Sequence, residues 1–164
     1  PEGWTRTSYR RASLANWMTD PNRGAGKLAA RVIVNRLWQH HFGRGLVATP
    51  NDFGVSGERP SHPELLEWLA SDLVQHGWKL KRLHRLIMTS SVWMQSGDSD
   101  EARAQLDREN TLLWRRSPMR LEAEAIRDSM LSVSGLLDLQ QFGPGTLDQN
   151  MRRRSITSSS NAAS

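Results

Sequence analysis

The spacing of apolar residues constrains this chain more than any other feature, because they recur at intervals of three or four positions. That interval places side chains on one face of an α-helix, whereas a half-buried strand would need strict alternation. Glycine and proline residues stand where these segments stop, as is typical of helix termini. We therefore predict an all-α, irregular multi-helix domain of about five or six helices.

The clearest helix is predicted over residues 61–76. Ser61 and Glu64 have the spacing of a capping box, in which the hydroxyl and the carboxylate satisfy free backbone N–H groups at the helix start. Gly77 followed by Trp78 predicts a Schellman motif at the helix end. The stripe expected to face the core consists of Leu66, Leu69 and Leu73, widened by Leu65 and Trp68.

Further helices are predicted over residues 9–19, 27–42, 79–90 and 101–107, and from Ser117-Pro118 to Gly135. Each except the short helix over 101–107 carries apolar residues at helical spacing, which we expect on its inner face. These residues are Leu14, Trp17 and Met18; Leu28, Val32, Ile33, Leu37 and Trp38; Leu80, Leu83, Leu86 and Ile87; and Ile126, Met130 and Val133.

A long Gly/Pro-rich loop over residues 43–59 connects two of these helices. Loops of this length are uncommon in compact domains unless they are functional or well packed. Phe53 is expected to anchor the loop on the helices, in the manner of an Ω-loop. The sequence therefore predicts an ordered structural corner whose polar rim is the best candidate site.

Asp52 is the centre of that candidate site, with an imidazole from His41 or His62 as its partner. A carboxylate and an imidazole together can perform acid–base chemistry in a hydrolase-like enzyme. The same residues have a structural interpretation, because Asn and Asp side chains in turns bind nearby backbone amides. The candidate binding residues on the rim are Arg44, Asn51 and Arg59.

A metal site is not expected. His40 and His41 are adjacent, so on a helix their side chains point about 100° apart and cannot easily face one ion. The sequence has no cysteine, which excludes disulfides, thiolate metal ligands and the C-x-x-C-H haem attachment within it. We expect no cofactor in this segment.

The charge balance indicates partners only weakly. The formal net charge is +5, from 22 basic and 17 acidic residues, and the basic residues are interleaved with acidic ones as on a solvated surface. A binding site for nucleic acid is therefore the weakest alternative, and an anionic or polysaccharide polymer remains a possible partner. No run of about 18 apolar residues is present, so no transmembrane segment is expected.

Several stretches in order resemble one known family. They are "RRASLANWMTD", "ARVIVNRLWQHHFGRGLVATPNDFGVSGERPSHPELLEWLA", "GWKLKRLHRLIMTSSVW", "LLWRRSPMRLEAEAIRDSMLSVSG" and "RRRSI", and they cover roughly residues 10–156. The chain resembles a planctomycete-specific C-terminal domain of unknown function found in large cytochrome-c-associated proteins. The resemblance implies that haem belongs to a separate upstream domain and that the protein is exported, in the cell envelope or periplasm.

The chain departs from that family after "RRRSI", where "TSSSNAAS" replaces an extended segment and a further helical region. We therefore expect a truncated copy: a single helical domain over residues 1–154, itself a fragment of a larger domain or protein, and a disordered tail over 155–164. The expected function is a non-catalytic structural or interaction module that contacts neighbouring domains of the full-length protein. The alternative is a hydrolase-like site around Asp52 and His62.

Overall fold

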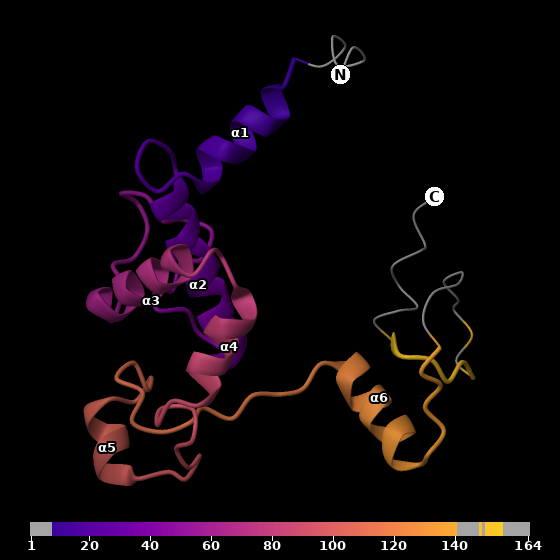
Figure 1. Ribbon diagram of the computed structural model, residues 1–164. Helices are drawn as coiled ribbons and strands as arrows, with labels where there is room; N and C mark the ends of the chain where they lie inside the picture. Colours follow the sequence, from indigo (N-terminus) through magenta and orange to yellow (C-terminus); the bar gives the residue numbers. More distant parts are fainter. Residues whose placement is uncertain (1–7, 141–147, 149, 156–164) are drawn as a thin grey trace. The chain divides into compact units, whose positions relative to one another are not determined.

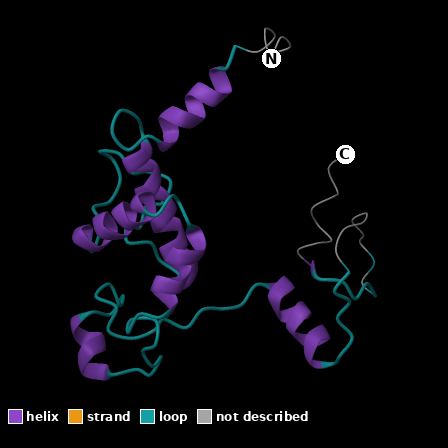
Figure 2. Cartoon of the chain, in the orientation of Figure 1, coloured by secondary structure: helices purple, strands orange, loops and turns teal. Residues whose placement is uncertain are grey.

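The computed structural model describes residues 8–140, 148 and 150–155. Within those residues the chain forms six α-helices and no β-strand, which confirms the predicted all-α class (Figure 2). The predicted tail over 155–164 lies outside the described residues, apart from Ser155. The helices are α1 (Arg10–Thr19), α2 (Gly26–Phe42), α3 (Pro63–Gln75), α4 (Leu80–Met88), α5 (Glu101–Leu106) and α6 (Ala123–Val133) (Figure 1).

The chain divides into two compact units, Pro1–Pro118 (unit 1) and Met119–Ser164 (unit 2). Unit 1 contains α1 to α5 and the long loop, and unit 2 contains α6. The single helical domain expected over residues 1–154 stays a prediction.

The hydrophobic core of unit 1 lies where α3 crosses α2, with α4 packed against both (Figure 1). The buried apolar residues of α2 are four positions apart and so share one face. Small alanines on both helices allow a close approach at the crossing. The buried apolar residues are Ala30, Val34, Trp38 and Phe42 of α2, Leu66, Leu69, Ala70 and Leu73 of α3, and Leu83 and Ile87 of α4.

Burial confirms the predicted leucine stripe of α3, but the predicted burial of some other apolar residues is wrong. Trp68 is 54% exposed. Successive residues of a helix are 100° apart around its axis, so the Trp68 side chain lies about 130° from the centre of the leucine stripe and faces away from α2. Leu28 is exposed because it lies off the buried row of α2, and Leu80 is exposed at the first position of α4. None of the residues of α1 is buried.

The end of α3 has the predicted Schellman motif. Gly77 adopts a left-handed φ of 69°, its N–H donates to the Val74 carbonyl at 3.1 Å, and the Trp78 N–H donates to the Leu73 carbonyl at 2.8 Å. These two bonds satisfy carbonyls that the helix leaves free at its end.

The predicted capping box at the start of α3 is wrong. His62 is the N-cap residue and no side chain caps the helix. The Ser61 hydroxyl donates instead to the Leu46 carbonyl at 3.2 Å, and the Ser61 N–H donates to the same oxygen at 2.8 Å. Ser61 therefore fastens the end of the long loop to its beginning.

In unit 2, α6 begins at Ala123, so the predicted start at Ser117-Pro118 is wrong. Ser117 belongs to unit 1, where its hydroxyl accepts a hydrogen bond from the Asn110 amide at 3.0 Å. The predicted end at Gly135 is confirmed. Its φ is 70°, and the Leu136 N–H donates to the Leu131 carbonyl at 2.9 Å.

Unit 2 is held together by polar contacts between α6 and the segment around residue 153. Arg127 donates to the carbonyls of Arg153, at 3.0 Å, and Met151. Asp128 accepts from the N–H and hydroxyl of Ser155, at 3.0 and 2.8 Å. The predicted inner stripe of this helix is exposed instead: Ile126, Met130 and Val133.

Candidate functional site

The long loop is fastened to α2 by Asn35, a fully buried amide. Its Nδ2 donates to the Val47 carbonyl at 2.9 Å and its Oδ1 accepts from the Val47 N–H at 2.8 Å. Both polar ends of the side chain are thus satisfied away from water. A Cβ at Gly45 would lie 2.7 Å from both Asn35 atoms and from the Val47 carbonyl, so this contact requires glycine.

Apolar side chains of the same loop complete its attachment. Leu46 and Val47 are buried in the core, and Phe53 is half-buried against it, as expected of an anchor. Val55, by contrast, is fully exposed. The loop is therefore ordered, with a buried base and an exposed tip.

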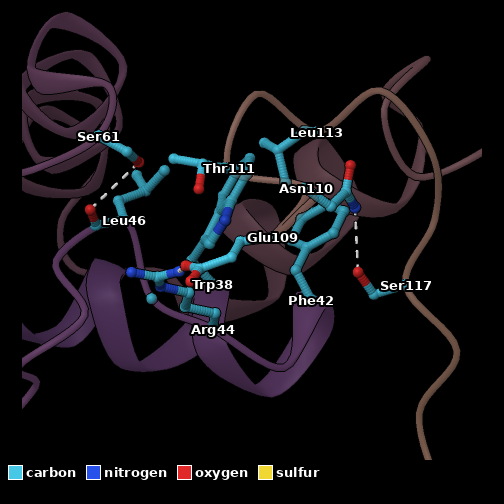
Figure 3. Close-up of a pocket in the computed structure, with 11 residues that line it drawn as sticks. Trp38, Phe42, Arg44, Leu46, Ser61, Glu109, Asn110, Thr111, Leu113 and Ser117 are labelled. Atoms are coloured by element: carbon cyan, nitrogen blue, oxygen red, sulfur yellow. Dashed lines mark hydrogen bonds and ion pairs between the residues drawn. The ribbon is translucent and has the colours of Figure 1, made fainter. Parts of the chain in front are cut away.

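A small cavity of about 60 Å³ lies at the base of this loop (Figure 3). Trp38 and Phe42 form one wall, with ring centroids 4.4 Å apart. Leu46 and Leu113 add apolar surface from the loop and from the segment that follows α5. This volume is above the roughly 10–15 Å³ that one ordered water molecule requires, so the cavity suits a small group only.

The charged side chains and the buried amide around this cavity are already paired. Arg44 donates to Glu109 at 2.8 Å, and both side chains are exposed. Asn110 is buried, and its Nδ2 donates to the Arg115 carbonyl at 2.7 Å and to Ser117 at 3.0 Å (Figure 3). The arrangement can hold a small group by shape and hydrogen bonding, and its paired charges are not poised for acid–base chemistry.

The three candidate catalytic residues each have a different partner. Asp52 Oδ1 accepts from the Gly54 N–H at 2.9 Å, which is the local turn bond of the structural interpretation. His62 Nδ1 lies 3.0 Å from the Ser61 hydroxyl. His41 Nε2 lies 2.8 Å from His84 Nδ1. Across the described residues, no hydrogen bond joins two of the three candidates.

The candidate binding residues are likewise separate. Arg44 pairs with Glu109, and Asn51 Oδ1 accepts from Arg36 at 3.2 Å. Arg59 is exposed beside Phe53, on an open groove of about 350 Å³ under the loop tip.

A second polar cluster surrounds His41, and its sequence-distant members were not predicted. His84, from α4, makes the 2.8 Å contact, and the Trp93 ring packs edge-on against His41 with centroids 5.0 Å apart. Arg116 lies over the Trp93 ring at 3.5 Å from its centroid. Burial, followed by the positive charges of His84, Arg116 and His40, lowers the pKa of His41 below its ordinary value of 6.5.

A third cluster joins α3 to α4. Asp72 is buried, and Arg82 donates to its two carboxylate oxygens at 2.9 and 3.1 Å. The hydrogen bond from Arg82 lowers the pKa of Asp72. This forked pairing joins the two helices and was not predicted from the sequence.

The described part of the chain contains no group of three or more histidine, cysteine, aspartate or glutamate side chains arranged to hold a metal ion. Among its helices, none combines the length and the apolar character that a membrane crossing requires.

A family model described as "PSD1: Protein of unknown function (DUF1553)" matches residues 10–163. This finding confirms the resemblance to a domain family of unknown function. No curated protein and no solved structure matches the chain.

Proposed function

We propose a non-catalytic interaction function for this chain, which belongs to the PSD1 family of proteins of unknown function (DUF1553). In this proposal it is a helical module that packs against a neighbouring domain of a larger, exported, haem-associated protein of planctomycete type. The family resemblance of its sequence motifs supports that setting. Haem, in this view, belongs to another domain.

The observation that carries the proposal is the exposed apolar face of α1. Leu14, Trp17 and Met18 stand at positions i, i+3 and i+4, so they share one face of the helix. They are 56%, 53% and 48% exposed. A surface helix normally buries such a stripe, whereas this one is left about half exposed in unit 1.

α1 contacts α2 but has few stabilising features of its own. It has 10 residues, no side-chain cap and no acidic residue in its first turn. Isolated helices shorter than about 12–15 residues are marginal in water, so burial of the apolar face would supply the missing stabilisation.

Charge defines the partner surface further. Arg10 and Arg11 are exposed in the first turn of α1, and the helix carries no acidic residue. The complementary surface is therefore an apolar groove bordered by carboxylates, on the domain that precedes this one in the full-length protein.

The test is a binding measurement between this chain and that preceding domain, produced as two polypeptides. Trp17→Ala should weaken the affinity, measured by calorimetry, by about 30-fold or more, because a central tryptophan contributes about 2 kcal/mol at an interface. Trp68→Ala is the matched control, since Trp68 is equally exposed but lies on α3.

Equal effects of the two substitutions, or no binding by the unsubstituted chain, would contradict the proposal. Circular dichroism of both variants verifies that the helices persist.

The hydrolase-like alternative around Asp52 and His62 stays a prediction. It requires two side chains whose described hydrogen bonds go to Gly54 and Ser61 instead of to each other. Binding of an anionic or polysaccharide polymer, or of nucleic acid, also stays a prediction.

A further inference from the structure

The contact between His41 and His84 imposes a limit on how many protons the two rings can hold. Nε2 of one and Nδ1 of the other are 2.8 Å apart and partly buried between α2 and α4. A hydrogen bond at this distance requires a proton on one nitrogen and a lone pair on the other. With both rings neutral, or with one of them protonated, one of these nitrogens can donate the hydrogen bond to the other. When both rings are protonated, the two facing nitrogens each carry a proton and the hydrogen bond is lost.

The surroundings of the pair oppose a second positive charge. The charged groups that face His41 are His84 on α4, Arg116 on the segment after α5, and His40 on α2 itself, and all are basic. Arg116 is fixed there because it lies over the Trp93 ring and donates to the Trp93 carbonyl at 3.1 Å.

The pair also lies at a junction of unit 1. Trp93 packs edge-on against His41 and against Phe42, with centroids 5.0 and 5.7 Å apart. Phe42 is in turn a wall of the small cavity at the base of the long loop. Separation of His41 from His84 would thus loosen α4, the Trp93 segment and one side of that cavity together.

We propose that the His41–His84 pair is a proton-sensitive latch, which holds α4 and the Trp93 segment against α2 and opens when both imidazoles are protonated. The proposal is independent of partner binding by α1. It makes unit 1 a structure with a closed state at neutral pH and a loosened state in mild acid.

The direction of the pH dependence follows from linkage. Because the pKa of His41 is lower in the folded chain than its ordinary 6.5, the unfolded or opened state binds more protons as the pH falls. The latch is therefore fully closed above about pH 6.5 and loses its contribution as the pH falls through the lowered value. The carboxyl of Asp72 has a pKa below its ordinary 3.8, so it stays ionised over this range.

The experiment is backbone hydrogen exchange of the chain at about pH 7.5 and about pH 5, with rates corrected for intrinsic exchange. Relative to the α3 core, protection of residues 80–95 should fall by about tenfold or more in acid. His41→Gln, which keeps a neutral hydrogen-bonding group, should abolish that fall. His40→Gln, at the adjacent exposed position, removes only the weakest of the charge effects on His41 and should leave most of the fall in place.

Equal protection at the two pH values in the unsubstituted chain would overturn the proposal, as would an undiminished fall in His41→Gln. If His41→Gln does not fold at neutral pH, His84→Gln provides the same test from the other side of the pair. The imidazole nitrogen resonances of the unsubstituted chain give a readout that needs no variant. Coupled titration of His41 and His84 supports the latch, and independent titration of the two rings contradicts it.

Discussion

Asn35 is the single residue on which the conformation of the long loop depends most. It is fully buried, and its amide makes two hydrogen bonds with the backbone of one residue, Val47. A buried backbone N–H or C=O that loses its hydrogen-bond partner lowers the free energy of unfolding by about 1–3 kcal/mol. This loss is larger than the net free energy that forming the bond contributes. The attachment of the loop therefore depends on this side chain as well as on apolar contacts.

Asn35→Leu should lower the free energy of unfolding by about 2–4 kcal/mol, because leucine has a similar branched shape but cannot hydrogen-bond, and so leaves both Val47 groups buried and unpaired. Urea denaturation followed by circular dichroism measures the loss. Asn51→Ala, at an exposed position of the same loop, should change the free energy of unfolding by less than about 0.5 kcal/mol. A similarly small change in Asn35→Leu would show that the apolar contacts alone hold the loop.

The burial of a residue was predictable where it follows from the apolar pattern of the residue's own helix. Leu66, Leu69 and Leu73 are buried as their spacing predicted. Asn35 and His84 were missed because each owes its role to a partner distant in sequence, 12 and 43 residues away respectively. A polar residue directly after an apolar row is the signal that would have found Asn35.

At the scale of the elements, the glycine-marked helix ends and most helix starts were predictable, whereas the two serine N-caps were not. Gly43, Gly77 and Gly135 have φ values of 85°, 69° and 70°, and each forms a terminus from bonds within a few residues. The serines expected as N-caps have tertiary partners instead. Ser61 binds Leu46 and Ser117 binds Asn110, so the local pattern gave the wrong start.

Gly77→Ala should destabilise the chain by about 1 kcal/mol, because a Cβ is disfavoured at positive φ even though it would meet no atom within 4 Å. Gly97→Ala is the matched control: its φ is not in the left-handed region, and the Cβ would meet the Arg116 carbonyl at an ordinary 3.5 Å. Thermal denaturation should show a loss for the first variant only. Equal losses would rule out the conformation of Gly77 as the cause.

At the scale of the whole molecule, family membership was predictable because several motifs occur in the same order along most of the chain. The candidate site stays a prediction: His41, Asp52 and His62 lie near one another in sequence and make separate contacts. In unit 1, α1 lies beside the helical core, which leaves the apolar face of α1 about half exposed.

Hydrogen exchange at the backbone amides of α1 tests the proposed interaction most directly, measured for the chain alone and in the presence of the domain that precedes it in the full-length protein. The account predicts near-unprotected exchange of residues 10–19 in the chain alone, and about tenfold or slower exchange when the partner domain covers Leu14, Trp17 and Met18. Protection of α1 that is the same in both samples would contradict the account.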